Sequence, residues 1–377
     1  MKNLTANTDI PPKVRLYFLD AVRAFAILMM LQGHFISGLL DPAFKDMGHY
    51  SYRFWLYCRG FTAPLFFTIT GWVFAFLLFR NPLQGLKNPR ISKGLRRAFE
   101  LILWGYALRL NLPTLFKGKL NSSFIQPDVL HIIALGLVFV LLAYAALHRY
   151  KKTMFAFFLG FGLIVFLTQP IYSGYIFENL PQFVAGYLTK GNGGVFYLFP
   201  WLGYVSIGAA IACVFKTHHN TSKLWAGGFM LLGAWLIFSS SWGLNRMGYL
   251  MDIELFKNVA NNNFLFIRLG DVFVLFGLFM FLQPLLKHSF WQQIGTKTLS
   301  LYIVHYFVLY GSLTGLGLYK FLKNSLDWQT AIIGAVAFVV GVSGLVLIYY
   351  KKEIQLRRAM RDFLWRLKQL LLPLRHR

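Results

Sequence analysis

The sequence predicts an all-α fold, a polytopic transmembrane helical bundle of about ten spans with the N- and C-termini in the cytoplasm. Composition is the first indication. Of the 377 residues, 57% are hydrophobic and 14% are charged, whereas a soluble globular domain has about 45–50% and about 25%. Long apolar runs recur along the whole chain, and the basic residues between them are unevenly distributed. These observations predict a protein whose main solvent is the lipid bilayer.

Ten segments are long and apolar enough to cross a membrane. A hydrocarbon core of about 30 Å needs roughly 20 apolar residues as a helix, because a helix satisfies its own backbone hydrogen bonds in lipid. We expect a cytoplasmic N-terminus over residues 1–15, a membrane domain over 16–350 and a cytoplasmic tail over 351–377. The ten segments lie near residues 16–38, 56–79, 98–116, 128–147, 153–171, 196–215, 223–241, 264–286, 298–318 and 328–350.

The distribution of Lys and Arg residues predicts the orientation. With the N-terminus inside, the inner loops and termini hold 25 of the 38 basic residues and the outer loops hold ten. This bias follows the positive-inside rule. The formal charge of +25 is therefore interpreted as a signal of topology beside anionic lipid, and we expect no nucleic-acid partner.

Two segments outside the spans have their own character. Residues 171–195 are interrupted by Gly and Pro, and we expect an outer loop with a short interfacial helix there. In the tail, apolar residues recur at helical spacing opposite basic residues, which predicts an amphipathic helix on the inner leaflet. The alternative is a solvated basic end. The apolar face would contain Met360, Phe363, Leu364, Leu367, Leu370 and Leu371.

Ionisable residues inside the spans are the clearest indication of function. They are costly in lipid and usually face a bundle interior or a water-filled cavity. Here they indicate a polar path across the membrane, although each one alone can also be a hydrogen-bonding strut or part of a structural ion pair. The spans contain Asp20, Arg23, His34, Glu100, Arg109, Asp128, His131, Arg268, Asp271 and His305.

The first span predicts how this path is arranged. Arg23 and His34 are eleven residues apart, so they share one helix face and are separated by about 16 Å along the axis. Asp20 precedes Arg23 by three residues and can pair with it. In the predicted orientation Arg23 lies in the cytoplasmic third of the membrane and His34 lies toward the outer leaflet.

Other spans add groups to the same path. Asp128 and His131 form an i,i+3 pair that we expect near the depth of His34, and we expect His305 about two turns in from the cytoplasm. No His-x-x-x-His motif or carboxylate cluster occurs at ligand spacing, so we expect no metal site. Neither an inverted repeat nor a helix interrupted near the midplane, the usual signs of a secondary transporter, is evident.

Several motifs resemble those of membrane acyltransferases. The opening span is similar to that of two related families, acyltransferase family three and the heparan-alpha-glucosaminide N-acetyltransferase-like family. In the former, an Arg followed by a His is the defining pattern, which matches Arg23 and His34. Other matching segments are Phe66-Phe67-Thr68-Ile69-Thr70-Gly71-Trp72, Leu198-Phe199-Pro200-Trp201-Leu202-Gly203-Tyr204 and Ser300-Leu301-Tyr302-Ile303-Val304-His305.

The resemblance implies an enzyme of a bacterial inner membrane. It would transfer an acyl group, most simply acetyl, from cytosolic acyl-CoA to a hydroxyl or amine of an extracytoplasmic glycan or glycolipid. His34 would be a general base or a transient acyl carrier, and Arg23 would hold the donor. Heparan-type enzymes usually have Asn at the position of His34 and a catalytic His in the following loop, where this chain has His49, so the choice of histidine stays open.

The resemblance also suggests residues for the two substrates. The basic inner loop would bind the phosphates of coenzyme A, because guanidinium and ammonium groups complement phosphate oxygens. The alternative function is a transporter or flippase without acyl-transfer chemistry. Candidates for the donor phosphates are Arg90, Lys93, Arg96 and Arg97, and candidates for substrate binding are Asp20, His49, Asp128, His131 and His305. On the outer side, Asp128, His131 and Glu178 are the candidates for the acceptor.

Overall fold

The computed structural model describes residues 16–120, 122–194, 196–215 and 223–371. In these residues the regular structure is helical, and the only β-type pairs are two isolated bridges, Leu40 with Leu326 and Asn111 with Leu313. The predicted cytoplasmic N-terminus, residues 1–15, lies outside the described residues. The predicted all-α class is confirmed for the described residues.

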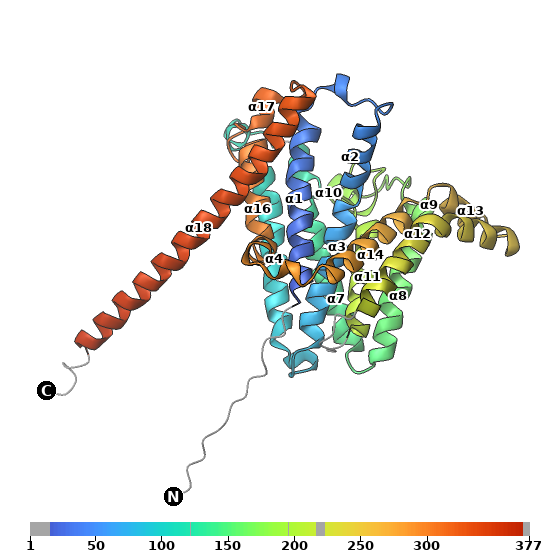
Figure 1. The fold of residues 1–377 in the computed structure, drawn as a ribbon, viewed down its shortest axis with the longest axis horizontal. Coiled ribbons are helices and arrows are strands. Elements are labelled where there is room, and N and C mark those ends of the chain that lie inside the picture. Colours follow the sequence, from blue (N-terminus) through green and yellow to red (C-terminus); the bar gives the residue numbers. More distant parts are fainter. Residues whose placement is uncertain (1–15, 121, 195, 216–222, 372–377) are drawn as a thin grey trace, which may run out of the picture.

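The long helices form a bundle around α1 (Figure 1). They are α1 (Tyr17–Leu39), α3 (Thr62–Phe79), α4 (Pro89–Arg109), α7 (Val129–Leu147), α8 (Lys151–Leu167), α11 (Leu198–Val214), α12 (Lys223–Leu250), α14 (Phe264–Phe281) and α18 (Trp328–Leu371). Shorter helices are α2 (Tyr50–Gly60), α5 (Leu112–Leu115), α6 (Ser122–Ile125), α9 (Gln169–Tyr172), α10 (Gln182–Leu188), α13 (Glu254–Asn261), α15 (Ser289–Thr296), α16 (Thr298–His305) and α17 (Leu318–Leu322). Short turns are η1 (Pro42–Phe44), η2 (Gly85–Lys87) and η3 (Leu285–Lys287), and η4 (Tyr306–Tyr310) is a π-helix.

Each of the ten predicted segments contains a helix, although the ninth is helical only as far as Tyr310. In the described residues, six helices are long and apolar enough to cross a membrane by length and composition, and α11 and α16–η4 are shorter apolar helices. Helices α4 and α8 cover the remaining two predicted segments. The number of ten spans and the orientation stay predictions. The six helices that are long and apolar enough to cross a membrane are Tyr17–Leu39, Tyr50–Phe79, Val129–Leu147, Lys223–Leu250, Phe264–Phe281 and Trp328–Glu353.

Close packing of α3 on α11 holds the centre of the bundle. A Cβ added at Gly71 would collide with the backbone carbonyl of Val205, and one added at Gly208 would collide with that of Thr68. Small residues at such contacts allow helix backbones to approach closely, which is how helices associate where lipid removes the hydrophobic driving force. Trp72 is fully buried beside this contact.

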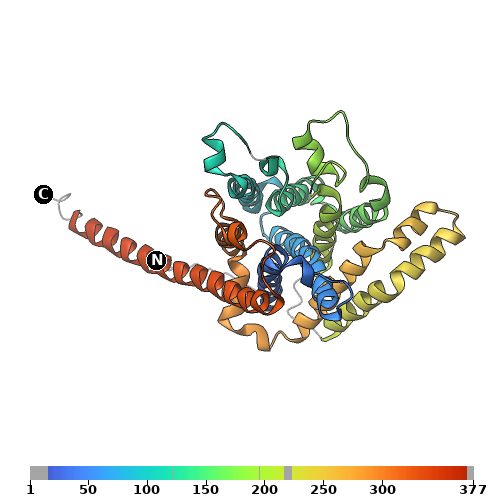
Figure 2. The same cartoon turned by 90° about the horizontal axis from the view of Figure 1, so that it is seen from above.

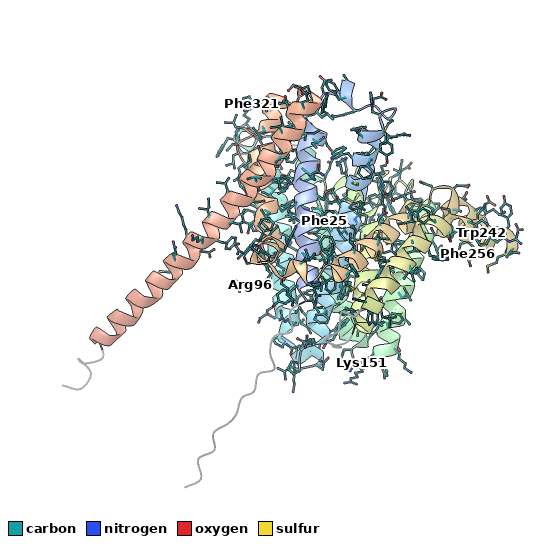
Figure 3. All side chains as sticks on the ribbon, viewed as in Figure 1. Phe25, Arg96, Lys151, Trp242, Phe256 and Phe321 are labelled. Atoms are coloured by element: carbon teal, nitrogen blue, oxygen red, sulfur yellow. The ribbon has the colours of Figure 1, made fainter. Side chains whose placement is uncertain are left out.

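Residues of the predicted inner loops and of the predicted outer loops lie at opposite ends of the bundle. Arg96 and Lys151, both assigned to the inner side, lie toward the lower part of Figure 3, and Phe321, assigned to the outer side, lies at the top. Seen from above, α12 and α14 project together to one side of the bundle, and α18 projects to another (Figure 2). The predicted outer segment 171–195 contains the expected short helix, α10.

The predicted tail continues the last span. α18 runs for 44 residues without interruption and ends at Leu371, leaning away from the bundle in Figure 1. The side chains of most tail residues lie outside the described ones, so the placement of an apolar face on the inner leaflet stays a prediction. The tail up to Leu371 is therefore helical, but it is not a separate helix.

Two of the predicted spans contain a local irregularity, whereas the prediction excluded only helices interrupted near the midplane. α2 ends at Gly60 and α3 begins at Thr62, inside the segment predicted as one span over 56–79. The reason is Pro64, which lacks the N–H that would bond to the Gly60 carbonyl in a continuous helix. The second interruption is η4, where α16 changes to a π-helix after His305. Such π segments are rare and frequently occur at functional sites.

Candidate functional site

A cavity of about 630 Å³ lies beside α1 and contains charged groups among mostly apolar side chains. Its walls come from α1, the α2–α3 junction, α4, α7 and α16. Irregular backbone and charge at membrane depth are tolerated where they line such a cavity. The lining residues with ionisable or hydroxyl side chains are Arg23, His34, Arg59, Thr62, Thr70, Arg97, Arg109, Asp128, Thr298, Tyr302 and Tyr306.

Two guanidinium groups mark the end of the cavity that is predicted to face the cytoplasm. Arg23 donates a hydrogen bond from Nη2 to Thr298 Oγ1 at 3.3 Å, at the first residue of α16. Arg97 of α4 lines the same cavity and pairs with Glu100 at 2.9 Å. Arg97 is therefore the member of the predicted donor-binding group that reaches the cavity.

His34 lies about three turns farther along α1, in the same cavity. Its Nδ1 is 3.0 Å from the hydroxyl of Tyr310, and its ring meets that of His305 edge to face, with 5.3 Å between centroids. As predicted, Arg23 and His34 are far apart along α1. Each is hydrogen-bonded to a different residue of one segment, α16–η4, Arg23 to Thr298 and His34 to Tyr310. Tyr310 is the last residue of that π-helix.

His305 lies deeper in the bundle than predicted. The prediction of two turns from the cytoplasm is wrong, because the ring is beside His34. The physical reason is α15, whose Gly295 packs on the backbone carbonyl of Asp20 and so starts α16 at the depth of Arg23. The His305 ring is fully buried, and in the described part of the chain neither ring nitrogen has a hydrogen-bond partner.

Asp128 joins three helices at the same end of the cavity as His34. It is the N-cap of α7, where its Oδ1 accepts from the backbone N–H of Val129 at 2.7 Å. Oδ1 is 3.6 Å from Nη2 of Arg109 on α4, and Oδ2 accepts from the Tyr302 hydroxyl on α16 at 2.8 Å. With 2% of Asp128 exposed, these partners offset the cost of burying its charge.

The predicted Asp128–His131 pair is a capping box. His131 Nδ1 accepts from the backbone N–H of Asp128 at 2.9 Å. The His131 ring lies 4.3 Å from that of Tyr106, between centroids, and is not among the cavity-lining residues. This histidine therefore fixes the start of α7, and through it the position of Asp128.

The remaining predicted site residues lie outside the cavity wall. His49 is 81% exposed, on the loop before α2, with its Nε2 3.8 Å from an Asp46 carboxylate oxygen. Arg90, Lys93 and Arg96 occupy the first turns of α4 and do not line the cavity. Asp20 is half-buried on α1, where its carbonyl contacts Gly295.

Sequence reasoning missed several cavity residues. Arg59, Thr298, Tyr302 and Tyr306 line the cavity but had no predicted role, and neither had Tyr310, the hydrogen-bond partner of His34. The spacing of the tyrosines is a usable signal, because residues four apart share a helix face, and a buried Tyr hydroxyl normally finds a polar partner. Tyrosines spaced four residues apart around an intramembrane His therefore indicate hydrogen-bond partners for that site.

A second buried charge pair joins α2 to α14. Arg268 Nη1 and Asp271 Oδ2 are 3.0 Å apart, which gives the eighth predicted span its own ion pair. The Tyr57 hydroxyl donates to Asp271 Oδ1 at 2.7 Å, and the guanidinium lies 4.2 Å from the Tyr57 ring centroid. Neither Arg268 nor Asp271 lines the cavity. This cluster holds the last turn of α2 against α14.

Comparison with known proteins identifies one family. A family model described as heparan-alpha-glucosaminide N-acetyltransferase, catalytic, matches residues 15–251, which is more than half of the chain. No curated protein and no solved structure gives a significant match. The matched region supplies Arg23, His34, Arg59, Arg97, Arg109 and Asp128 to the cavity, and α16 with η4 lies beyond it.

Proposed function

This chain belongs to the heparan-alpha-glucosaminide N-acetyltransferase catalytic family, and from that premise we propose that it transfers an acetyl group across the membrane. The donor is cytosolic acetyl-CoA, and the acceptor is an amine or hydroxyl of an extracytoplasmic glycan or glycolipid, in a bacterial inner membrane. The observation that carries the proposal is the single cavity, with Arg23 and Arg97 at one end and His34 at the other.

The donor enters at the end with the two guanidinium groups. Arg23 and Arg97 bind phosphate oxygens of coenzyme A, which guanidinium forks match in geometry and charge. Arg90, Lys93 and Arg96 lie outside the cavity on α4 and raise the local concentration of the anionic donor. The axial distance of about 16 Å from Arg23 to His34 suits the extended arm that carries the thioester.

The reaction takes place at His34. When Nδ1–H donates to the Tyr310 oxygen, the lone pair of Nε2 is available to react. The nitrogen or oxygen of the acceptor attacks the thioester carbonyl while His34 Nε2 takes the proton from that atom. The C–S bond then breaks, and the proton passes from Nε2 to the departing thiolate. An acetyl-histidine intermediate is the alternative route, in which Nε2 itself attacks the carbonyl.

The transfer assay uses purified protein in vesicles loaded with labelled acetyl-CoA, with acceptors added outside. His34→Ala should lower kcat by about 10²–10⁴-fold, the usual contribution of a general base. His49→Ala should retain nearly full activity, because that side chain is exposed and outside the cavity. Full activity of a folded His34→Ala protein refutes the assignment, and loss of activity in His49→Ala transfers it to the loop histidine.

The same assay separates an enzyme from a carrier. An acetyltransferase releases free CoA-SH in proportion to acetylated acceptor. A transporter or flippase moves a compound without releasing CoA-SH, and its transport continues in His34→Ala. Labelled acetyl trapped on the protein after acid quench, and lost in His34→Ala, identifies the covalent route.

A further inference from the structure

A second cavity, the lateral groove, has a volume of about 750 Å³ and lies between two pairs of helices. One wall comes from α8 and α11, and the other comes from α12 and α14. The latter pair projects to one side of the bundle in Figure 2. The lateral groove shares no lining residue with the cavity that contains His34. It is therefore separate from the proposed reaction site.

The lateral groove opens sideways to the membrane. Its back wall is buried, since Ile207 and Leu269 are each 3% exposed, whereas Trp235 and Trp242 at its rim are 56% and 72% exposed. Trp242 lies on the projecting end of α12, far from Phe25 of α1 (Figure 3). Because α12 is long and apolar enough to cross a membrane, the solvent at this rim is lipid, and a hydrocarbon chain can enter from the side.

The lining of the groove is apolar along its length and carries its charge at one end. Along α12 it runs from Trp225 to Met247, 22 residues later, which is about 33 Å and matches a hydrocarbon core of about 30 Å. The one ionisable side chain among the lining residues is that of Arg246, at the end predicted to be extracytoplasmic. The one hydroxyl, that of Ser240, is already bonded to the Asn263 amide at 2.7 Å. A ligand that matches this lining is a chain with a polar group at one end.

Arg246 has a charge that the protein leaves unpaired. No carboxylate lies within ion-pair distance of its guanidinium among the residues that the structure describes, and the acidic residues that follow α12, Asp252 and Glu254, pair with Lys257 at 3.7 and 3.1 Å. Arg246 is exposed at the rim, one turn after Trp242 on the same face of α12, and Trp and Arg are usual anchors at the headgroup level. Guanidinium groups match phosphate oxygens in geometry and charge. The polar group that fits this end is therefore a phosphate.

The spacing along α12 fits one leaflet of the bilayer. Arg246 and Trp235 are eleven residues apart, about 16 Å along the axis, and one leaflet contributes about half of a 30 Å hydrocarbon core. Gly243 lies between them and lines the groove, and a Cβ added there would have nothing within 4 Å. An acyl chain that starts at Arg246 can therefore pass Gly243 without obstruction and end beside Trp235.

We propose that the lateral groove binds an anionic phospholipid from the leaflet on the predicted extracytoplasmic side. Its phosphate pairs with Arg246, and one acyl chain fills the groove from Gly243 to Trp235. The net negative charge of such a lipid neutralises a guanidinium that is otherwise unpaired beside apolar surface, whereas a zwitterionic headgroup brings its own cation and compensates the arginine less. The site is independent of acetyl transfer, and the lipid joins the α12–α14 pair to α8 and α11.

The test is native mass spectrometry of the full-length protein in detergent, titrated with phosphatidylglycerol or with phosphatidylcholine of identical acyl chains. The wild-type protein should bind phosphatidylglycerol with a Kd at least tenfold lower than its Kd for phosphatidylcholine. Arg246→Gln should remove this preference, because it removes the charge and leaves the groove open. Gly243→Leu should raise the Kd for both lipids at least tenfold, because its side chain fills the space of the acyl chain.

Two matched controls make the result specific. Gly227→Leu adds the same side chain to α12 at a position where nothing lies within 4 Å of the Cβ and which does not line the groove. Arg53→Gln removes an exposed arginine of α2 outside the groove. Both controls should bind the two lipids as the wild type does. An equal Kd for phosphatidylglycerol in the wild type and in either Arg246→Gln or Gly243→Leu overturns the inference, and so does a dimer that Gly243→Leu abolishes, because a second copy of the chain then occupies the groove.

Discussion

Replacing Asp128 tests how the cavity is held together, because one carboxylate serves α4, α7 and α16. Asp128→Asn keeps one oxygen to cap α7, and its amide NH2 can donate to the Tyr302 hydroxyl in place of the bond that the carboxylate accepts, but the variant removes the negative charge opposite Arg109. Asp128→Ala removes the cap and both side-chain partners. The two variants therefore separate the contribution of the charge from that of the hydrogen bonds.

The structure sets the expected magnitudes. Breaking a buried ion pair by removing one partner costs about 3–5 kcal/mol. The lower figure applies here, because Arg109 also donates to the Gln126 carbonyl at 3.1 Å and its distance to Asp128 is 3.6 Å. We expect about 3 kcal/mol for Asp128→Asn. Asp128→Ala should lose about 2 kcal/mol more, roughly 1 for the cap and roughly 1 for the Tyr302 bond.

The assay is unfolding in detergent micelles, followed by the reactivity of the free cysteines Cys58 and Cys213. Midpoints should fall in the order wild type, Asp128→Asn, Asp128→Ala. The double variant Asp128→Asn with Arg109→Gln should lose less than the sum of the two single losses, because neither charge is then left unpaired. An unchanged midpoint for Asp128→Asn, or strictly additive losses in the double variant, refutes the ion-pair reasoning.

Three further predictions follow from single contacts. Tyr310→Phe removes the hydroxyl that lies 3.0 Å from His34. The loss of this one hydrogen bond should lower kcat of acetyl transfer about tenfold and leave KM unchanged. An unchanged kcat contradicts the role of Tyr310. His305→Phe replaces a fully buried ring whose nitrogens lack partners, so thermal unfolding should show equal or higher stability, and a clear loss would reveal a polar partner. Gly71→Ala places a Cβ against a backbone carbonyl of α11 and should reduce folded yield and melting midpoint. Gly227→Ala, with nothing within 4 Å of the added Cβ, should change neither, and equal behaviour of the two variants rejects the close-packing argument.

The fold could be predicted from the sequence because lipid imposes a simple rule on the backbone. An apolar run of about 20 residues is stable in a bilayer only as a helix, and each of the ten predicted segments contains a helix. The interruptions were not predicted, although Pro64 gives a local reason for one of them. Hydropathy averages over a window and does not register a single missing N–H.

The site could be predicted only within single helices. The shared face of Arg23 and His34 and the capping pair of Asp128 and His131 follow from helical periodicity. Contacts between helices depend on packing angle and depth, which periodicity does not contain. The depth of His305 is the clearest example, because it is set by the contact of α15 with α1 rather than by distance along the chain from the last inner loop.

The packing of α16–η4 on α1 gives the cavity a fixed length. α16–η4 runs beside α1 in the same direction and touches it at both ends of the path, with Thr298 on Arg23 and Tyr310 on His34. The two contacts are twelve residues apart on α16–η4 and eleven apart on α1. A π turn holds more residues per turn than an α turn, so η4 takes up the extra residue and keeps both pairs aligned. The π-helix thus follows from matching two helices at two points, and it holds the Arg23 end of the cavity and His34 at one separation.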